Sequence, residues 1–219
     1  MLINLRNALM AGKHTPTAQD YVQSGLVAMF DGIENAGWGV HDENATKWRE
    51  LVTGVDYDVA GTWDGNVFVP ATTDLNSAFI QNVIAYLPRT IEFCSDNTDV
   101  LTNNQYNGFY FYGSDRIYSR GRGTRTQISF ISSDAGLSTV MYSGPKGGTL
   151  SLVSNLNEAT GFINGASAVS GEIIGKTVEA SLYWYGNSRI NCLRIYSRAL
   201  TASEIARNYA IDKARFGLP

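Results

Sequence analysis

Residues 190–216 read INCLRIYSRALTASEIARNYAIDKARF, and this stretch decides the fold class of the 219-residue chain. In its first part, Leu193 and Ile195 alternate with polar residues such as Arg194. That period-two pattern is typical of a β-strand with one buried face. Residues 197–200 then turn the chain before a helical pattern begins. The stretch therefore predicts a strand, a corner and a helix.

The predicted helix has start and stop signals. Thr201 is a favourable N-cap, and Glu204 three residues later completes a capping box. Lys213 and Arg215 fall in the last turn, where positive charges interact favourably with the helix dipole. Gly217 can adopt the left-handed conformation that commonly ends a helix. We therefore expect a helix that begins after Thr201, ends at Gly217 and packs on a sheet.

The rest of the chain alternates short apolar segments with turn residues. Three dipeptides favour tight turns because Asn, Asp and Gly tolerate positive φ: Asp64-Gly65, Asn107-Gly108 and Asn164-Gly165. Many short strands at roughly 8–12 residue spacing indicate a sandwich or barrel. We predict an all-β, two-sheet antiparallel jelly-roll sandwich with a C-terminal helix. No fixed-length repeat is visible, which excludes a propeller or solenoid.

The stretch LRIYSRALTASEI at residues 193–205 resembles the C-terminal signature of the bacterial LamG-like, concanavalin A-like jelly-roll domains. Four earlier segments resemble the family in the same order: GLVAMFDG at 25–32, GTWDGN at 61–66, TIEF at 90–93 and FING at 162–165. The resemblance spans residues 22–216 and implies a jelly-roll sandwich. The whole arrangement, including DGIENAGWG at residues 31–39, also resembles prophage-encoded proteins of gut bacteria.

We expect an N-terminal extension over residues 1–20 and a LamG-like domain over residues 21–219. Apolar residues recur at helical spacing between residues 2 and 10, which predicts a short N-terminal helix. Residues 2–10 then either pack back on the sandwich or bind a partner, such as a second copy of the chain or a phage structural protein.

Charge and hydrophobicity argue against two classes of partner. The chain has 17 Lys and Arg against 20 Asp and Glu, a net charge of −3. We expect no nucleic-acid binding, because that needs a basic surface to neutralise phosphates. We also expect no membrane insertion, since no stretch has the length of a membrane span.

Residues 1–10 lack the apolar run and cleavage site of a signal peptide. A role outside the cell would therefore need another route, such as assembly into a phage particle that is released by lysis. Cys94 and Cys192 lie in predicted strands, where a free cysteine behaves as a small apolar side chain. The sequence thus favours two free thiols over a disulfide.

Catalytic signals are weak. A glycoside hydrolase needs two carboxylates across the scissile bond. Glu92 and Asp96 share one face of a predicted strand but lie too far apart along it, and Cys94 stands where a second carboxylate would be needed. The two histidines, His14 and His41, accompany no nucleophile elbow and no zinc-binding cluster. We expect no enzymatic activity.

One loop is a candidate calcium site. Calcium binds carboxylate and carbonyl oxygens without a fixed short motif. Asp31, Glu34 and Asn35, with Asp42 and Glu43 nearby, gather oxygen atoms around a glycine-rich loop. The family resemblance permits calcium because related domains often bind it. The alternative is a loop held by ordinary hydrogen bonds.

Aromatic residues supply candidate sugar-binding positions, because their apolar faces stack on sugar rings. The candidates are Trp38, His41, Tyr110, Tyr112 and Trp184. Trp38 lies between two glycines in a loop, whereas Trp48, Trp63 and Trp184 fit core packing better. The leading hypothesis is a noncatalytic module that binds a glycan or another cell-surface ligand. The alternatives are a structural or assembly module and, less favoured, a glycoside hydrolase.

Overall fold

The computed structural model describes residues 15–71, 74–75, 88–95, 106–111, 116–122, 125–132, 135–142, 148–155, 158–172, 182–186 and 189–218. The helix predicted within residues 2–10, together with its proposed role in assembly, lies outside this part of the chain. Among the described residues, no helix has the length and apolar character needed to cross a membrane.

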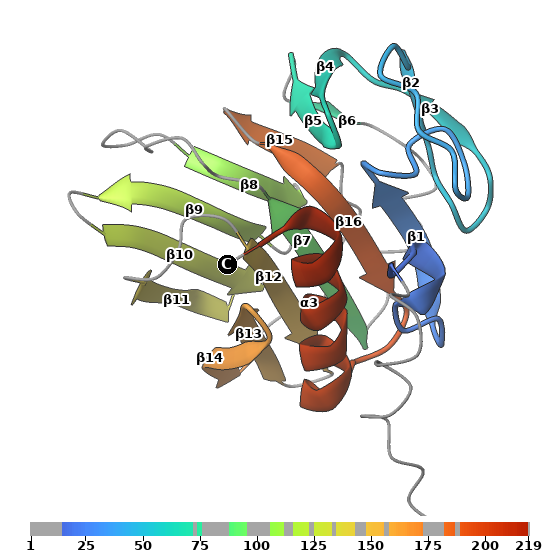
Figure 1. Cartoon of the computed structure of the whole chain (residues 1–219). Coiled ribbons are helices and arrows are strands. Elements are labelled where there is room, and N and C mark those ends of the chain that lie inside the picture. Colours follow the sequence, from blue (N-terminus) through green and yellow to red (C-terminus); the bar gives the residue numbers. More distant parts are fainter. Residues whose placement is uncertain are drawn as a thin grey trace, which may run out of the picture.

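The protein is an all-β sandwich with one C-terminal α-helix, as predicted (Figure 1). The larger, eight-stranded sheet contains β1 (Leu26–Asp31), β4 (Gly61–Asp64), β5 (Val67–Pro70), β7 (Arg89–Ser95), β12 (Gly148–Ser154), β13 (Glu158–Ile163), β14 (Ala166–Glu172) and β16 (Ile190–Tyr196). The six-stranded sheet contains β6 (Asp74–Leu75), β8 (Tyr106–Phe111), β9 (Arg116–Arg122), β10 (Arg125–Ser132), β11 (Ala135–Tyr142) and β15 (Leu182–Gly186). A separate hairpin joins β2 (Lys47–Arg49) to β3 (Asp56–Asp58).

Strand β16 is the centre of the large sheet. It pairs antiparallel with β1 and β7 and also contacts β5. All seven of its residues are buried, so the prediction of a single buried face was wrong. The reason is that helix α3 (Ala202–Phe216) covers the face on which the sequence predicted solvent (Figure 1).

The structure confirms the predicted start and end of helix α3. Thr201 accepts a hydrogen bond from the Glu204 amide at 3.3 Å, and its own amide donates to the Glu204 carboxylate at 2.9 Å. Gly217 ends the helix with φ of 65°, in the left-handed region. The predicted capping box and C-cap are therefore confirmed.

The turn predictions had mixed outcomes. Asn164 and Gly165 link β13 to β14 with φ of 51° and 77°, the positive values that a tight hairpin needs. Asn107 and Gly108 form no turn, because both lie inside β8, which pairs with β9 and β15. The hydrogen-bond ladders on both sides of this strand outweigh the local turn preference.

Each face of the large sheet has its own apolar cluster. One cluster is rich in aromatic rings, and Trp48 at its centre is fully buried against Phe30 and Phe68. Trp63 packs against the same cluster, so the core interpretation holds for both tryptophans. The second cluster lies beneath α3 and includes the apolar residues Ile205, Ile211, Tyr196 and Leu200.

Cys94 and Cys192 also belong to the cluster beneath α3. They face each other on β7 and β16, and both are buried free thiols. Burial raises the pKa of each thiol well above its usual value. The expectation of two free cysteines is confirmed.

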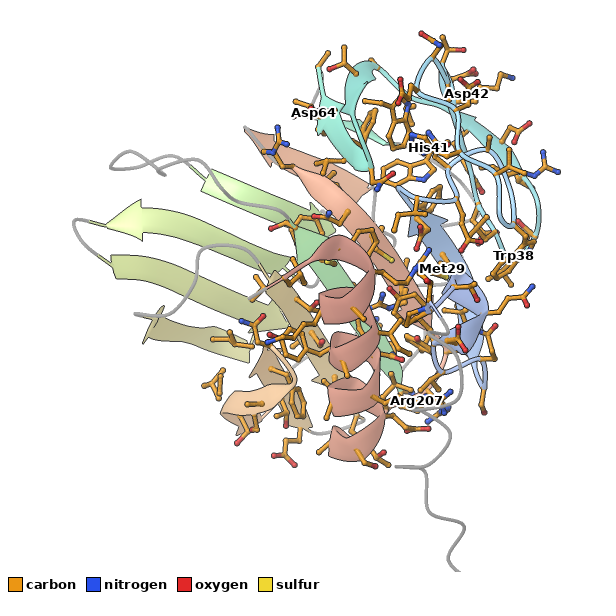
Figure 2. The ribbon with its side chains drawn as sticks, in the orientation of Figure 1. Met29, Trp38, His41, Asp42, Asp64 and Arg207 are labelled. Carbon is orange, nitrogen blue, oxygen red and sulfur yellow. The ribbon has the colours of Figure 1, made fainter. Side chains whose placement is uncertain are left out.

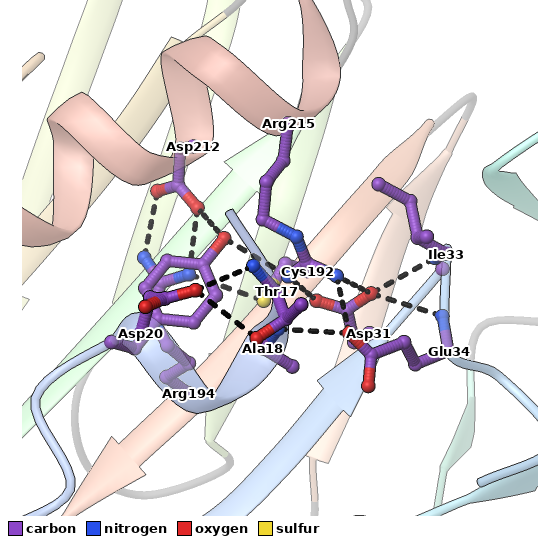
Figure 3. A network of polar contacts seen from close by, with 12 residues as sticks. Thr17, Ala18, Asp20, Asp31, Ile33, Glu34, Cys192, Arg194, Asp212 and Arg215 are labelled. Atoms are coloured by element: carbon purple, nitrogen blue, oxygen red, sulfur yellow. Dashed lines mark hydrogen bonds and ion pairs between the residues drawn. The ribbon is translucent and has the colours of Figure 1, made fainter. Parts of the chain in front are cut away.

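A buried polar network crosses the second cluster, and Figure 3 shows the part of it around Arg194 and Asp212. Arg194 donates to Glu92 at 2.9 Å and to both oxygens of Asp212, each at 2.7 Å. Asn208 donates to Glu92 at 2.7 Å, and the hydroxyl of Tyr21 donates to Asp212 at 2.6 Å. The network joins two strands, α3 and the N-terminal segment, and all five side chains are nearly or fully buried.

Replacing Arg194 by Met should lower the free energy of unfolding by about 3–5 kcal/mol, because Glu92 and Asp212 would stay buried without a cation. Chemical denaturation followed by circular dichroism measures this. Lys47→Met is the matched control, since the Lys47–Asp58 pair is exposed and should contribute less than about 1 kcal/mol. Equal losses in the two variants would contradict a structural role for the buried pair.

The interactions of Glu204 should make the free energy of unfolding depend on pH in the acid range. The hydrogen bond from Arg198 is the largest effect that lowers the pKa of Glu204 from its usual 4.5 to about 2. Because the folded-state value is depressed, this stabilisation is complete above pH 4.5 and is lost as the pH falls towards 2. Glu204→Gln should therefore cost about 1 kcal/mol at pH 7 and almost nothing at pH 2. A pH-independent difference between the melting curves would contradict this.

Candidate ligand-binding site

The segments that join β1 to β4 gather beyond one edge of the large sheet (Figures 1 and 2). We call residues 32–60 the loop end. It contains a pocket of about 250 Å³ lined by Asn35, Ala36, Asp42, Ala45, Thr46, Lys47, Arg49 and Asp56. This volume is close to the lower limit of about 300 Å³ for typical small-ligand pockets.

Strand β2 places two cations on the pocket wall. Successive strand side chains point to opposite faces, so Trp48 enters the core while Lys47 and Arg49 line the pocket. Arg49 donates to Asp56 on β3 at 3.1 Å, and Lys47 lies 3.7 Å from Asp58. Both are exposed pairs, which are worth at most about 1 kcal/mol each and can open towards a ligand.

Two glycines lie close to the Arg49 side chain. A Cβ on Gly37 would lie 3.6 Å from the Arg49 Cδ, and one on Gly54 would lie 3.4 Å from its Nη2. Both glycines have positive φ, 137° and 73°, which side chains rarely tolerate. The hairpin at residues 37–40 and the turn at residues 51–55 therefore lie on either side of Arg49.

The base of the pocket is held rigidly. The Asn35 side chain donates to the Asp42 carbonyl and accepts from the Asp42 amide, both at 2.8 Å. The indole of Trp63 donates to the Ala45 carbonyl at 2.9 Å. These bonds fix the backbone at Asp42 and at Ala45, two of the lining residues.

Glu34 connects the loop end to the core. One carboxylate oxygen accepts from the Ala18 amide at 2.8 Å and from Arg215 at 2.9 Å (Figure 3). The other oxygen accepts from the Gly39 amide at 2.9 Å. Gly39 belongs to the 37–40 hairpin, so a buried carboxylate fixes the segment that carries Trp38.

The three calcium candidates have protein partners instead of open oxygens. Asp31 forms a two-pronged ion pair with Arg215, which also binds Glu34, and Asn35 is committed to the Asp42 backbone. Burial raises the pKa of Asp31, and the neighbouring Arg215 charge opposes that rise. Within the described residues, no group of three or more His, Cys, Asp and Glu could hold a metal ion. The cation beside these carboxylates is a guanidinium from α3.

The structure separates the candidate aromatic residues. Trp38 is 40% exposed at the tip of the 37–40 hairpin, and His41 lies on the same loop end (Figure 2). The His41 ring contacts the Gly32 carbonyl through Nδ1 at 2.9 Å and packs edge-on against Trp63. Tyr110 on β8 and Trp184 on β15 belong to the six-stranded sheet. Tyr112 lies outside the described residues.

Four polar pocket residues were missed by the sequence analysis: Thr46, Lys47, Arg49 and Asp56. A signal for them existed. The segments KWR and DYD each place charges on both sides of an aromatic residue, which is the pattern of paired strands with one polar face. Three exposed valines, Val40, Val52 and Val55, also lie on the loop end.

Glu34→Gln should loosen the 37–40 hairpin. The new amide group would keep its oxygen towards Ala18 and Arg215 and would turn a donor towards the Gly39 amide. Losing this charge-assisted bond should speed hydrogen exchange of the Gly39 amide at least about tenfold. Heteronuclear NMR can measure it, with the exposed Glu158→Gln change as the control. Unchanged Gly39 exchange would show that Glu34 does not hold the hairpin.

Comparisons with known proteins support the fold. No known family model matches the chain, and no curated protein matches it. The structure of Trypanosoma rangeli sialidase is similar, with a TM-score of 0.59, 14% identity, and coverage of 90% of this chain and 33% of the sialidase. The chain thus spans about a third of that protein.

Botulinum neurotoxin binding domains are also similar in structure. The receptor-binding domain of the C/D mosaic serotype has a TM-score of 0.54 and 12% identity over 85% of this chain and 51% of that one. The DC binding domain in complex with SialylT has a TM-score of 0.56 and 11% identity over 88% and 52%. At such low identity these similarities establish a shared β-sandwich fold.

Proposed function

We propose that this chain is a noncatalytic LamG-like module that binds a glycan at the loop end. The observation that carries the proposal is the exposed Trp38 on a fixed hairpin whose base, Ala36, lines a polar pocket. Sugar sites combine an aromatic face for the ring with side chains that bind hydroxyl groups. The loop end offers both features on one rigid support.

The proteins of similar structure support the glycan-binding proposal through their fold. A Trypanosoma rangeli sialidase structure is described in complex with sialic acid, and a neurotoxin binding domain in complex with SialylT. Related sandwiches therefore occur in proteins that bind sugars. A shared fold hosts many functions, so the argument for this chain rests on its own site.

We propose a noncatalytic role because the buried carboxylates of this chain form ion pairs and hydrogen bonds that hold the fold together. Glu92, the sequence candidate for catalysis, is fully buried and bound to Arg194 and Asn208. The pocket acids Asp42 and Asp56 are exposed to solvent, whereas the general acid of a glycosidase works from an apolar site. Release of reducing sugar that disappears in Asp42→Asn would contradict this part of the proposal.

An assembly module is the second candidate. Val40, Val52 and Val55 expose apolar side chains on the same loop end as Trp38, and exposed apolar patches commonly mark protein interfaces. If the loop end binds a protein, substitutions of these valines should matter as much as substitution of Trp38. The two candidates therefore differ in which side chains they require.

The wild-type chain should bind specific oligosaccharides on a glycan array, and titration calorimetry can then measure affinity for the best ligand. Trp38→Ala should weaken that affinity about tenfold, because a stacking face is lost. Val52→Ala is the matched control, and it should bind as the wild type does. Thermal melts of both variants confirm folding. Absence of glycan binding by the wild-type chain would overturn the proposal, and equal losses in both variants would contradict a stacking role for Trp38.

A further inference from the structure

We infer that the pocket at the loop end selects an uncharged saccharide over an acidic one. This inference rests on the proposed glycan-binding function and specifies its ligand class.

The charges on the pocket wall cancel. Among the lining residues, Lys47 and Arg49 are cations, while Asp42 and Asp56 are anions. The cations are already paired across β2 and β3, Arg49 with Asp56 and Lys47 with Asp58. A sugar carboxylate that approached these cations would lie near the acids that pair with them and near Asp42. The wall therefore provides no net attraction for an anion.

The polar atoms of the pocket that can still form hydrogen bonds suit the hydroxyl groups of a sugar. In the described part of the chain, Arg49 uses one guanidinium nitrogen on Asp56, and its other N–H groups have no protein partner. Asp42 accepts one bond from the Asn44 amide through Oδ1, which leaves Oδ2 as a further acceptor. The Thr46 hydroxyl, also on the wall, can both donate and accept.

This mixture of donors and acceptors favours hydroxyl groups, because each hydroxyl can donate one hydrogen bond and accept others. A carboxylate can only accept. It would leave the Asp42 and Asp56 oxygens facing another acceptor. The same wall that suits a neutral sugar therefore disfavours a sialic or uronic acid.

The test compares neutral oligosaccharides with sialylated and uronic-acid versions of the same core. Calorimetry on the full chain at low and high NaCl should give at least about tenfold tighter binding of the neutral sugar. Its affinity should change less than about twofold with salt, because no net charge is neutralised. Tighter binding of the acidic version that weakens with salt would overturn the inference but leave glycan binding intact. No binding of any sugar would overturn the proposed function, and the inference with it.

A variant that changes the net charge of the pocket provides a second test. Asp42→Asn gives the pocket a net positive charge, so the ratio of neutral to acidic affinity should fall about tenfold. Asp64→Asn makes the same charge change outside the pocket lining, on an exposed side chain at the end of β4 (Figure 2). It should leave the ratio unchanged. Equal shifts in both variants, or no shift in Asp42→Asn, would count against selection by the pocket.

Discussion

A guanidinium group buried between the large sheet and the C-terminal helix is the constraint on which the rest of the structure depends. Arg194 projects from the central strand β16 into a closed space. A buried charge needs partners to avoid a large desolvation cost. Glu92 supplies one from β7 and Asp212 another from α3. The apolar side chains of this face favour burial of the helix in general, whereas the ion pairs favour one position of the helix on the sheet.

The same helix supports the loop end through a second guanidinium. Arg215, in the last turn of α3, binds Asp31 at the end of β1 and Glu34 in the following loop. Glu34 in turn accepts a hydrogen bond from Gly39, next to Trp38. The exposed aromatic side chain is thus tied to the core by buried ion pairs. A rigid support of this kind reduces the entropy lost when a ligand binds.

The proposed binding site lies in a different part of the molecule from the two sheets that define the fold. The chain is similar in fold to part of a sialidase and to part of neurotoxin binding domains, although fewer than one residue in five is identical. The loop end of this chain contains the β2–β3 hairpin and its paired charges. Loops placed on a rigid scaffold commonly carry binding functions. The proposed ligand class follows from the polar pocket of the loop end, whose lining charges cancel.

The sequence alone determined the features that short-range chemistry controls. The strand around Leu193, the Thr201–Glu204 capping box and the Asn164-Gly165 turn could be predicted because each depends on neighbouring residues. Only the tertiary structure decided the partners of buried charges. Asp31 suggested a calcium ligand, but its counterion Arg215 lies 184 residues away in sequence. The pocket likewise combines residues from separate loops, and its electrostatic balance exists only once β2 and β3 have paired.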